Sequence, residues 1–180
     1  MNPARAGVFE SLSEMGAAIT HINVREEGGE PVADLTIRAS ALTGIRVPAS
    51  RAASMIDEYP VLAVAAACAT GTSVFEGVGE LRVKESDRLA AIETGLRACG
   101  VDVSADADSI TIQGCGGPPP GGVTIATNLD HRIAMSFLVF GLATQAPVSI
   151  DDIRPSETSF PGFATAMRDL GADISETPET

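Results

Sequence analysis

The segment "RVKESDRL" at residues 82–89 concentrates side chains that could act on a small anion. Three cations, Arg82, Lys84 and Arg88, lie there with two acids, in surroundings rich in alanine, valine and glycine. Lys84 is the only lysine in the 180-residue chain, so a need for solubilising charge does not explain its position. The segment therefore indicates a local charged site, whose chemistry depends on the elements that hold it.

The segment is predicted to open a helix, and two other predicted helix starts also carry polar residues. Pro60 is tolerated only in a first turn, which begins one helix near Asp57 and makes Asp57 or Ser54 its N-cap. The other N-cap candidates are Ser86 or Asp87 for the helix after Lys84, and Asn128 or Asp130 for the helix at His131 and Arg132. Capping alone accounts for these acids.

The cations at the helix starts need another explanation. The positive end of a helix dipole makes a nearby cation less favourable by roughly 0.3–1 kcal/mol. Lys84 and Arg88 nevertheless lie at one such start, and His131 and Arg132 lie at another. A bound phosphate or carboxylate would use the free N–H groups, the dipole and the cations together.

These charges allow two interpretations. In the first, "KESDR" is a solvated ion-pair set that neutralises itself. In the second, equivalent helix starts share one anion, with Asp57 and Glu85 placed for acid–base chemistry on it. The recurrence of the arrangement favours the shared anion site.

An internal repeat predicts the fold that positions these helices. Three segments share a helix end, a glycine and an alternating strand: "LSEMGAAITH" at 12–21, "LRACGVDVSA" at 96–105 and "MRDLGADISE" at 167–176. Gly16, Gly100 and Gly171 suit the left-handed residue that ends a helix. One supersecondary unit is therefore used three times.

The segments between the repeats complete an α+β fold. Two nearly all-apolar helices, within 56–77 and 129–152, must be surrounded by protein. In the helix after Lys84, an apolar stripe is buried while Arg88 and Arg97 face solvent. Strands are predicted at 19–25, at 33–40, in "VDVSA" and "SITIQG", and at 122–126, and "GGPPPGG" is predicted as a surface hairpin loop. The result is a set of repeated βαββαβ-like units with buried helices surrounded by sheets.

The composition indicates one packed domain over residues 1–180. A net charge of -12 argues against nucleic acid and anionic membranes as partners, because both need a basic stripe. No apolar run could cross a bilayer and "MNPARAGVFE" lacks the apolar core of a signal peptide, so a cytoplasmic location is expected. Cys68, Cys99 and Cys115 share no short spacing, so neither a disulfide framework nor a metal site is predicted.

Four motifs together resemble the C-terminal part of the 5-enolpyruvylshikimate-3-phosphate synthase family, the 3-phosphoshikimate 1-carboxyvinyltransferases. They are "SMIDEYPVLAVAAA", "LRVKESDRLAAI", "LDHRIAMSFLV" and "TSFPGF", in family order, within a match from about Pro3 to about Ile174. "MIDEYP" and "RVKESDRL" are similar to the bacterial branch associated with glyphosate tolerance. The resemblance implies one of the two domains of an inverse α/β barrel fold, with the other domain absent.

The resemblance implies transfer of a carboxyvinyl group from phosphoenolpyruvate to shikimate 3-phosphate, with release of phosphate and without metal or organic cofactor. Asp57 would contact the attacking hydroxyl as its base or orienting group. Glu85 would handle protons at the methylene carbon of phosphoenolpyruvate. Lys84 would approach shikimate 3-phosphate and the reacting centre. These three positions are the implied catalytic residues.

The resemblance also implies the substrate contacts. Arg88 and Arg132 would hold the carboxylate of phosphoenolpyruvate, with His131 beside them, and the planar fork of arginine suits two oxygens. Lys84 and Asp57 would also contact substrate. Because the family enzyme is more than twice as long, this chain alone is expected to be inactive.

Two positions depart from the family pattern, and two other functions compete. Thr158 replaces a lysine found in many members, and Glu80 replaces an asparagine. The first departure implies altered contact with phosphoenolpyruvate or an inhibitor, and the second concerns the shikimate side. A related transferase acting on a uridine-diphosphate sugar has different motifs around "RVKESDRL". A non-catalytic module that binds an anion or the missing partner domain is the alternative from another class.

Overall fold

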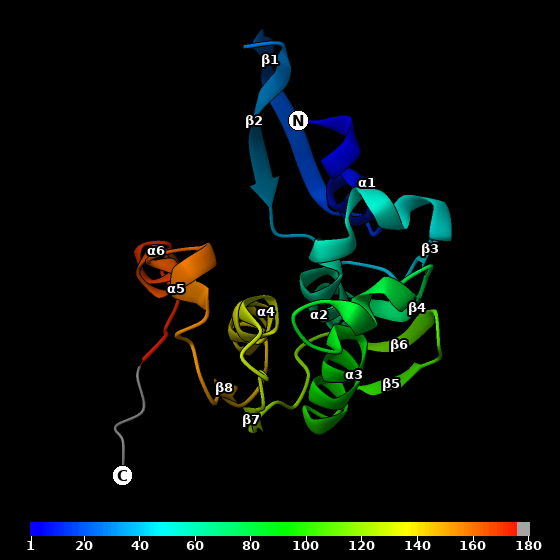
Figure 1. Ribbon diagram of the computed structural model, residues 1–180, viewed down its shortest axis with the longest axis vertical. Helices are drawn as coiled ribbons and strands as arrows, with labels where there is room; N and C mark the ends of the chain where they lie inside the picture. The colour runs from blue at the N-terminus through cyan, green and yellow to red at the C-terminus, as the bar shows by residue number, and fades with distance from the viewer. Residues whose placement is uncertain (176–180) are drawn as a thin grey trace.

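The computed structural model describes residues 1–175, in which helices and strands alternate along the chain (Figure 1). The α-helices are α1 (Gly7–Glu14), α2 (Tyr59–Cys68), α3 (Arg88–Ala98), α4 (His131–Gly141), α5 (Ser156–Ser159) and α6 (Phe163–Asp169). The strands are β1 (Ala18–Glu27), β2 (Glu30–Arg38), β3 (Arg46–Val47), β4 (Thr70–Glu76), β5 (Asp102–Ala105), β6 (Ser109–Cys115), β7 (Thr124–Ile125) and β8 (Ser149–Ile150). Short 3-10 helices are η1 (Pro3–Arg5), η2 (Ala49–Ser54), η3 (Ile56–Glu58) and η4 (Gly79–Val83).

A four-stranded sheet and two helices form one complete repeating unit. The strand order is β3-β4-β6-β5, with β3 parallel to β4 and the other pairs antiparallel. The inner face of the sheet buries Val103, Ile110 and Ile112 against α2 and α3. Read from β3, the unit runs strand, helix, strand, helix, strand, strand.

The glycine that ends each repeated helix adopts the predicted left-handed conformation. The φ angles are 94° at Gly16, 82° at Gly100 and 94° at Gly171, where a side chain would be strained. After Gly16 and Gly100 the chain enters β1 and β5, as the repeat predicts. After Gly171, residues 172–175 form no strand, and residue 176 of the third segment lies outside the described residues.

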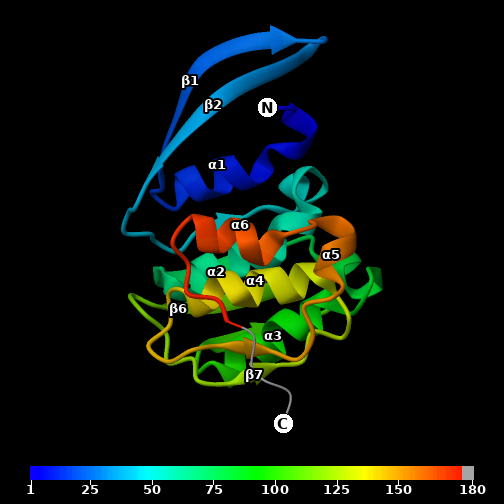
Figure 2. The same ribbon diagram turned by 90° about the vertical axis from the view of Figure 1, so that its left-hand side faces the viewer.

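The two all-apolar helices lie side by side in the body of the molecule. Figure 2 shows α2 and α4 running roughly in parallel, below the β1–β2 hairpin. α2 buries Leu62 and Ala66 completely, but Val61 is exposed, so protein surrounds this helix on most of its faces and not on all of them. α4 buries Ile133 and Phe137 and leaves Leu138 half-buried, and none of its residues is fully exposed.

α3 crosses α4 at a glycine. A Cβ atom added to Gly95 would lie 2.2 Å from Cζ of Phe137, so a larger residue could not occupy this position without a shift of the ring. The ring of Phe137 thus packs directly against the backbone of α3 near its C-terminal end.

The β1–β2 hairpin stands apart from the rest of the molecule (Figures 1 and 2). Its two strands pair antiparallel, as the sequence predicts for the segments on either side of "EEGGEP". Gly28 and Gly29 make the turn with positive φ angles. A two-stranded sheet is marginal by itself, so the hairpin depends on what packs against it.

The remaining sequence expectations meet mixed outcomes. "GGPPPGG" does not close a hairpin, because the chain leaves β6 and crosses to β7, which pairs with β8. Cys99 is buried, Cys68 half-buried and Cys115 exposed, and burial raises the pKa of Cys99 to about 11. A frayed tail is also expected from the polar sequence "SETPET" at 175–180, of which all but Ser175 lies outside the described residues. None of the helices in the described part is long and apolar enough to span a membrane.

Candidate functional site

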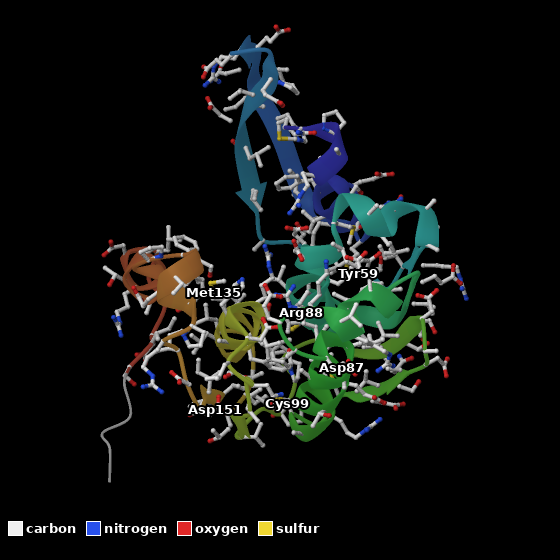
Figure 3. The ribbon with its side chains drawn as sticks, viewed as in Figure 1. Tyr59, Asp87, Arg88, Cys99, Met135 and Asp151 are labelled. Atoms are coloured by element: carbon white, nitrogen blue, oxygen red, sulfur yellow. The ribbon has the colours of Figure 1, made fainter. Side chains whose placement is uncertain are left out.

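The starts of α2, α3 and α4 meet around the guanidinium group of Arg88, between these three helices (Figure 3). Arg88 begins α3, Asp57 lies just before α2 and Asp130 just before α4. Hydrogen bonds join the guanidinium to both carboxylates. The structure thus brings together the charged helix starts that the sequence singles out.

The prediction that Arg88 faces solvent is wrong, because its side chain is only 1% exposed. Its Nε donates to Asp130 Oδ2 over 2.8 Å, and its Nη2 donates to Oδ1 over 3.3 Å. Asp130 is itself fully buried. A buried charge is tolerated only when it is paired and hydrogen-bonded, so each member of the pair accounts for the burial of the other.

Asp130 caps α4, as one of the two candidates predicted for that position. Its Oδ1 accepts hydrogen bonds from the backbone N–H groups of Arg132 and Ile133 at 2.9 and 3.4 Å, and its Oδ2 accepts from Ser86 Oγ at 2.9 Å. Burial raises the pKa of this carboxyl, but hydrogen bonds and charge from Arg88 outweigh burial, with help from Ser86 and the Arg132 N–H. The pKa therefore lies below its ordinary value, and the carboxyl is ionised at neutral pH.

Neither candidate N-cap of α2 caps that helix. Ser54 Oγ donates to the carbonyl of Arg51, and the N-cap position is Glu58, whose side chain makes no capping bond. The carboxylate of Asp57 instead lies near three guanidinium groups: Arg88 Nη1 at 3.1 Å, Arg5 Nη2 at 3.6 Å and Arg132 Nη2 at 3.8 Å. Asp57 remains partly exposed, so a small molecule can reach it.

Arg132 ties the start of α4 to the segment before α2. Its Nη1 donates to the backbone carbonyl of Asp57 over 3.0 Å and lies 3.7 Å from Glu58 Oε1. His131 precedes it as the first residue of α4 and is half-buried. Both residues therefore lie at the helix start where they are predicted.

The cations of "RVKESDRL" are each paired with a carboxylate. The pairs are Lys84 Nζ with Glu80 Oε1 at 2.5 Å, Arg82 Nη1 with Asp87 Oδ2 at 3.2 Å, and Arg88 Nη2 with Glu85 Oε2 at 2.5 Å. Asp87 also caps α3 through the N–H of Ala90, as predicted. The interpretation of "KESDR" as a set that neutralises itself holds only for Glu85 and Arg88, because Lys84 and Asp87 pair with Glu80 and Arg82 outside that segment. It also does not account for a buried Arg88.

Two residues of this cluster, Arg5 and Glu58, are not predicted from the sequence. Arg5 Nη2 lies 3.4 Å from Glu58 Oε1 as well as near Asp57. No helical or strand period relates Arg5 to a residue 53 positions away, so its role had no sequence signal. Glu58 had one, because it directly follows Asp57 in "MIDEYP".

Neighbouring groups limit the chemistry that the cluster can do. Burial raises the pKa of Tyr59 to about 12 and outweighs the opposing charge of Arg51, so this hydroxyl stays neutral at pH 7 and does not act as a base. No group of three or more His, Cys, Asp or Glu side chains within residues 1–175 is placed to hold a metal ion. Asp57, Glu58 and Glu85 are partly exposed beside guanidinium groups, so a small molecule could reach these carboxylates.

Sequence comparison places the chain among known proteins. The sequence model of EPSP synthase (3-phosphoshikimate 1-carboxyvinyltransferase) matches residues 1–167. The 3-phosphoshikimate 1-carboxyvinyltransferase of Rhodospirillum rubrum is 63% identical over 175 residues, which are 97% of this chain and 39% of that protein. The protein of the same name from Granulibacter bethesdensis is 59% identical over 175 residues, 97% of this chain and 38% of that protein. The chain thus spans about two fifths of the length of these relatives.

Solved structures agree with the sequence comparison. An EPSP synthase from Acinetobacter baumannii is similar with a TM-score of 0.93 and 43% identity, over 99% of this chain and 41% of that chain. The enolpyruvyl transferase NikO from Streptomyces tendae is similar with a TM-score of 0.70 over 98% of this chain and 37% of that chain, at 21% identity, a likeness of fold alone. The predicted fold class, that of the enolpyruvyl transferases, is confirmed.

Replacing Asp130 by Asn is expected to lower the free energy of unfolding by about 3–5 kcal/mol, the usual cost of leaving one buried charge without its partner. Asn retains the shape of the side chain and can still cap α4. The loss is therefore attributable to the ion pair with Arg88. Urea denaturation of the two proteins measures it.

The matched control is Asp87→Asn, which changes the cap of α3 at a site where the ion pair is with the more exposed Arg82. Its expected cost is below about 1 kcal/mol. Because the folded-state pKa of Asp130 is lowered, its contribution is complete above the ordinary carboxyl pKa and disappears as the pH falls through the folded-state value. Equal losses for both variants at neutral pH would contradict the central role of Asp130.

Proposed function

The chain belongs to the EPSP synthase family, and on that premise we propose that its helix starts form part of a carboxyvinyl transfer site. The site would pass the carboxyvinyl group of phosphoenolpyruvate to a hydroxyl of shikimate 3-phosphate and release phosphate. The observation that carries the proposal is the convergence of Arg88 and Arg132 on Asp57. Since the chain spans about two fifths of its relatives, the rest of the enzyme would complete the site.

Arg88 and Arg132 would bind the carboxylate of phosphoenolpyruvate. Both guanidinium groups face Asp57 from neighbouring helix starts, where their combined charge suits an anion. Asp130 fixes Arg88 by two hydrogen bonds, so little motion would be lost when substrate binds. His131 lies beside Arg132, and Lys84 would add positive charge on the side of shikimate 3-phosphate.

Asp57 and Glu85 would share the proton transfers. Asp57 would orient the attacking hydroxyl and accept its proton as the new carbon–oxygen bond forms. Glu85, in its protonated form, would donate a proton to the methylene carbon to give the tetrahedral intermediate. It would take a proton back from the resulting methyl group as phosphate leaves, and Asp57 would return the hydroxyl proton to the departing phosphate. Glu85 is about half exposed and pairs with Arg88, so substrate must first separate the two side chains.

The branch of the family to which the chain belongs and its cellular location are also proposals. The wording of "MIDEYP" and "RVKESDRL" supports the branch associated with glyphosate tolerance. Thr158 Oγ1 donates to the carbonyl of Pro155, so α5 presents no cation at the position where many members have lysine. Free Cys68, Cys99 and Cys115 suit a reducing compartment and support a cytoplasmic location.

The exposed apolar side chains of the β1–β2 hairpin support the proposal that another part of the enzyme packs against it. Ile37 in β2 pairs across the hairpin with Ile19, as Ile112 in β6 pairs with Val103. Ile112 is fully buried against α2, whereas Ile37 is 62% exposed. We propose that the rest of the enzyme supplies the counterparts of β4 and α2 that cover this hairpin, so that residues 1–180 form most of one domain.

An assay of phosphate release tests the split site. The chain is mixed with phosphoenolpyruvate and shikimate 3-phosphate, alone and together with the separately produced remainder of the Rhodospirillum rubrum relative. Activity is expected only in the mixture, because the chain alone lacks the facing part of the site. Activity of the chain alone would contradict the partial-site proposal. Association of the two parts without activity would favour a non-catalytic anion-binding or partner-binding domain.

In the active mixture, Asp57→Asn is expected to lower kcat by about 10²–10⁴-fold, the usual contribution of a positioned acid–base group. Asn keeps the size of the side chain, so binding of the two parts should not change. Arg97→Ala is the control, since Arg97 is exposed and pairs with Glu93 far from this cluster. Unchanged kcat in Asp57→Asn would rule out the assigned role. Arg88→Ala is unsuitable, because it would leave Asp130 buried without its partner.

A further inference from the structure

We propose that Glu80 is a specificity-determining residue that competes with the substrate anion for Lys84. The inference rests on the proposed function for the identity of that anion. In the absence of an anion, Glu80 holds the ammonium group, and an incoming phosphate must displace the carboxylate. Glu80 therefore sets how tightly, and with what selectivity, the site binds anions through Lys84.

The contact comes from a short local segment. Lys84 Nζ lies 2.5 Å from Glu80 Oε1, and the two residues are four positions apart. η4 ends at Val83, so Lys84 is the first residue after this helix and its side chain turns back along it. The contact between Glu80 and Lys84 lies within residues 80–84 and does not depend on the rest of the enzyme.

The two ends of this pair are exposed to different degrees. The side chain of Lys84 is 22% exposed, whereas that of Glu80 is 61% exposed. An exposed carboxylate gains little from such a pair and is screened by solvent and salt. Lys84 also has a flexible stem and three donors that can turn to a new acceptor. The pair is therefore weak enough for a bound anion to replace.

Arg88 provides the contrast within the same site. Asp130, which is fully buried, holds its guanidinium with two hydrogen bonds, so Arg88 stays in place whether or not an anion is present. Two cations of the site thus differ in how they are held: a buried carboxylate holds Arg88, and an exposed carboxylate holds Lys84. Among the described residues Lys84 forms its ion pair with Glu80 alone, so a change at Glu80 removes the whole of that pairing.

The other acids of the segment have partners of their own. Glu85 pairs with Arg88, and Asp87 pairs with Arg82 and caps α3. Among residues 1–175, Glu80 is the carboxylate within salt-bridge distance of Lys84. Removal of its charge should therefore act on Lys84 and leave the rest of the cluster unchanged.

The single lysine gives a direct measurement. Protein labelled with 13C and 15N lysine shows one side-chain Cε–Nζ signal, which belongs to Lys84. Titration with inorganic phosphate is followed on this signal in the wild-type chain and in Glu80→Gln. The variant keeps the shape of the side chain and removes the competing charge. We expect phosphate to bind it about threefold more tightly, which corresponds to the strength of an exposed ion pair.

The matched control is Glu76→Gln. Glu76 is a surface carboxylate in β4 that pairs with Arg46, so this variant changes the net charge equally but not the contact of Lys84. Phosphate binding to the control should differ from wild type by much less than threefold. Equal tightening in both variants would overturn the proposal and leave the proposed function standing, because net charge alone would then explain the effect.

A second outcome separates the two claims. If phosphate leaves the Lys84 signal unmoved in all three proteins, the role of Lys84 in anion binding fails, and the inference fails with it. In the active mixture of the two enzyme parts, Glu80→Gln should lower the KM for shikimate 3-phosphate. The kcat should not change, because the charge of Glu80 weakens binding of the substrate and of the transition state equally. A fall in kcat with an unchanged KM would indicate a structural role and overturn the proposal.

Discussion

The buried ion pair between Arg88 and Asp130 is the constraint on which the site depends. It joins the starts of α3 and α4, and the same guanidinium reaches Asp57 before α2. Burial of two charges is costly, and well-packed apolar residues often stabilise a fold as well or better. The pair is therefore better explained by positioning than by stability, since it places one guanidinium at the junction of three helix starts.

The helix starts solve an electrostatic problem that the sequence poses. Arg88 at the start of α3 opposes the helix dipole, and the buried carboxylate of Asp130 compensates for its charge. Lys84 instead lies at the C-terminal end of η4 and pairs with the exposed Glu80. The two compensations differ in burial, so one cation is fixed while the other is exchangeable. An anionic substrate would replace the exposed carboxylates and leave the buried one in place. Binding of the substrate would then separate Glu85 from Arg88 in the same step and free Glu85 for proton transfer.

Local patterns predict the elements of this fold well, and they fail at contacts between distant residues. Gly16, Gly100 and Gly171 end helices as expected, because a left-handed residue is a local requirement. The burial of Arg88 depends on a carboxylate 42 positions away, and helical periodicity contains no information about it. The sequence predicts Asp57 as an N-cap for the same reason, because local patterns do not show its contact with Arg88, 31 positions along the chain. The family motifs identify these residues, but only the folded chain shows which of them touch.

The most direct test of this account is a double-mutant cycle between Arg88 and Asp130, measured by urea denaturation. Arg88→Met and Asp130→Asn are made singly and together, and the free energies of unfolding are compared. Each single variant should be strongly destabilised, while the double variant loses much less than the sum, with a coupling energy of about 2 kcal/mol or more. Losses that add within about 0.5 kcal/mol would contradict the account, because the two charges would then not depend on each other.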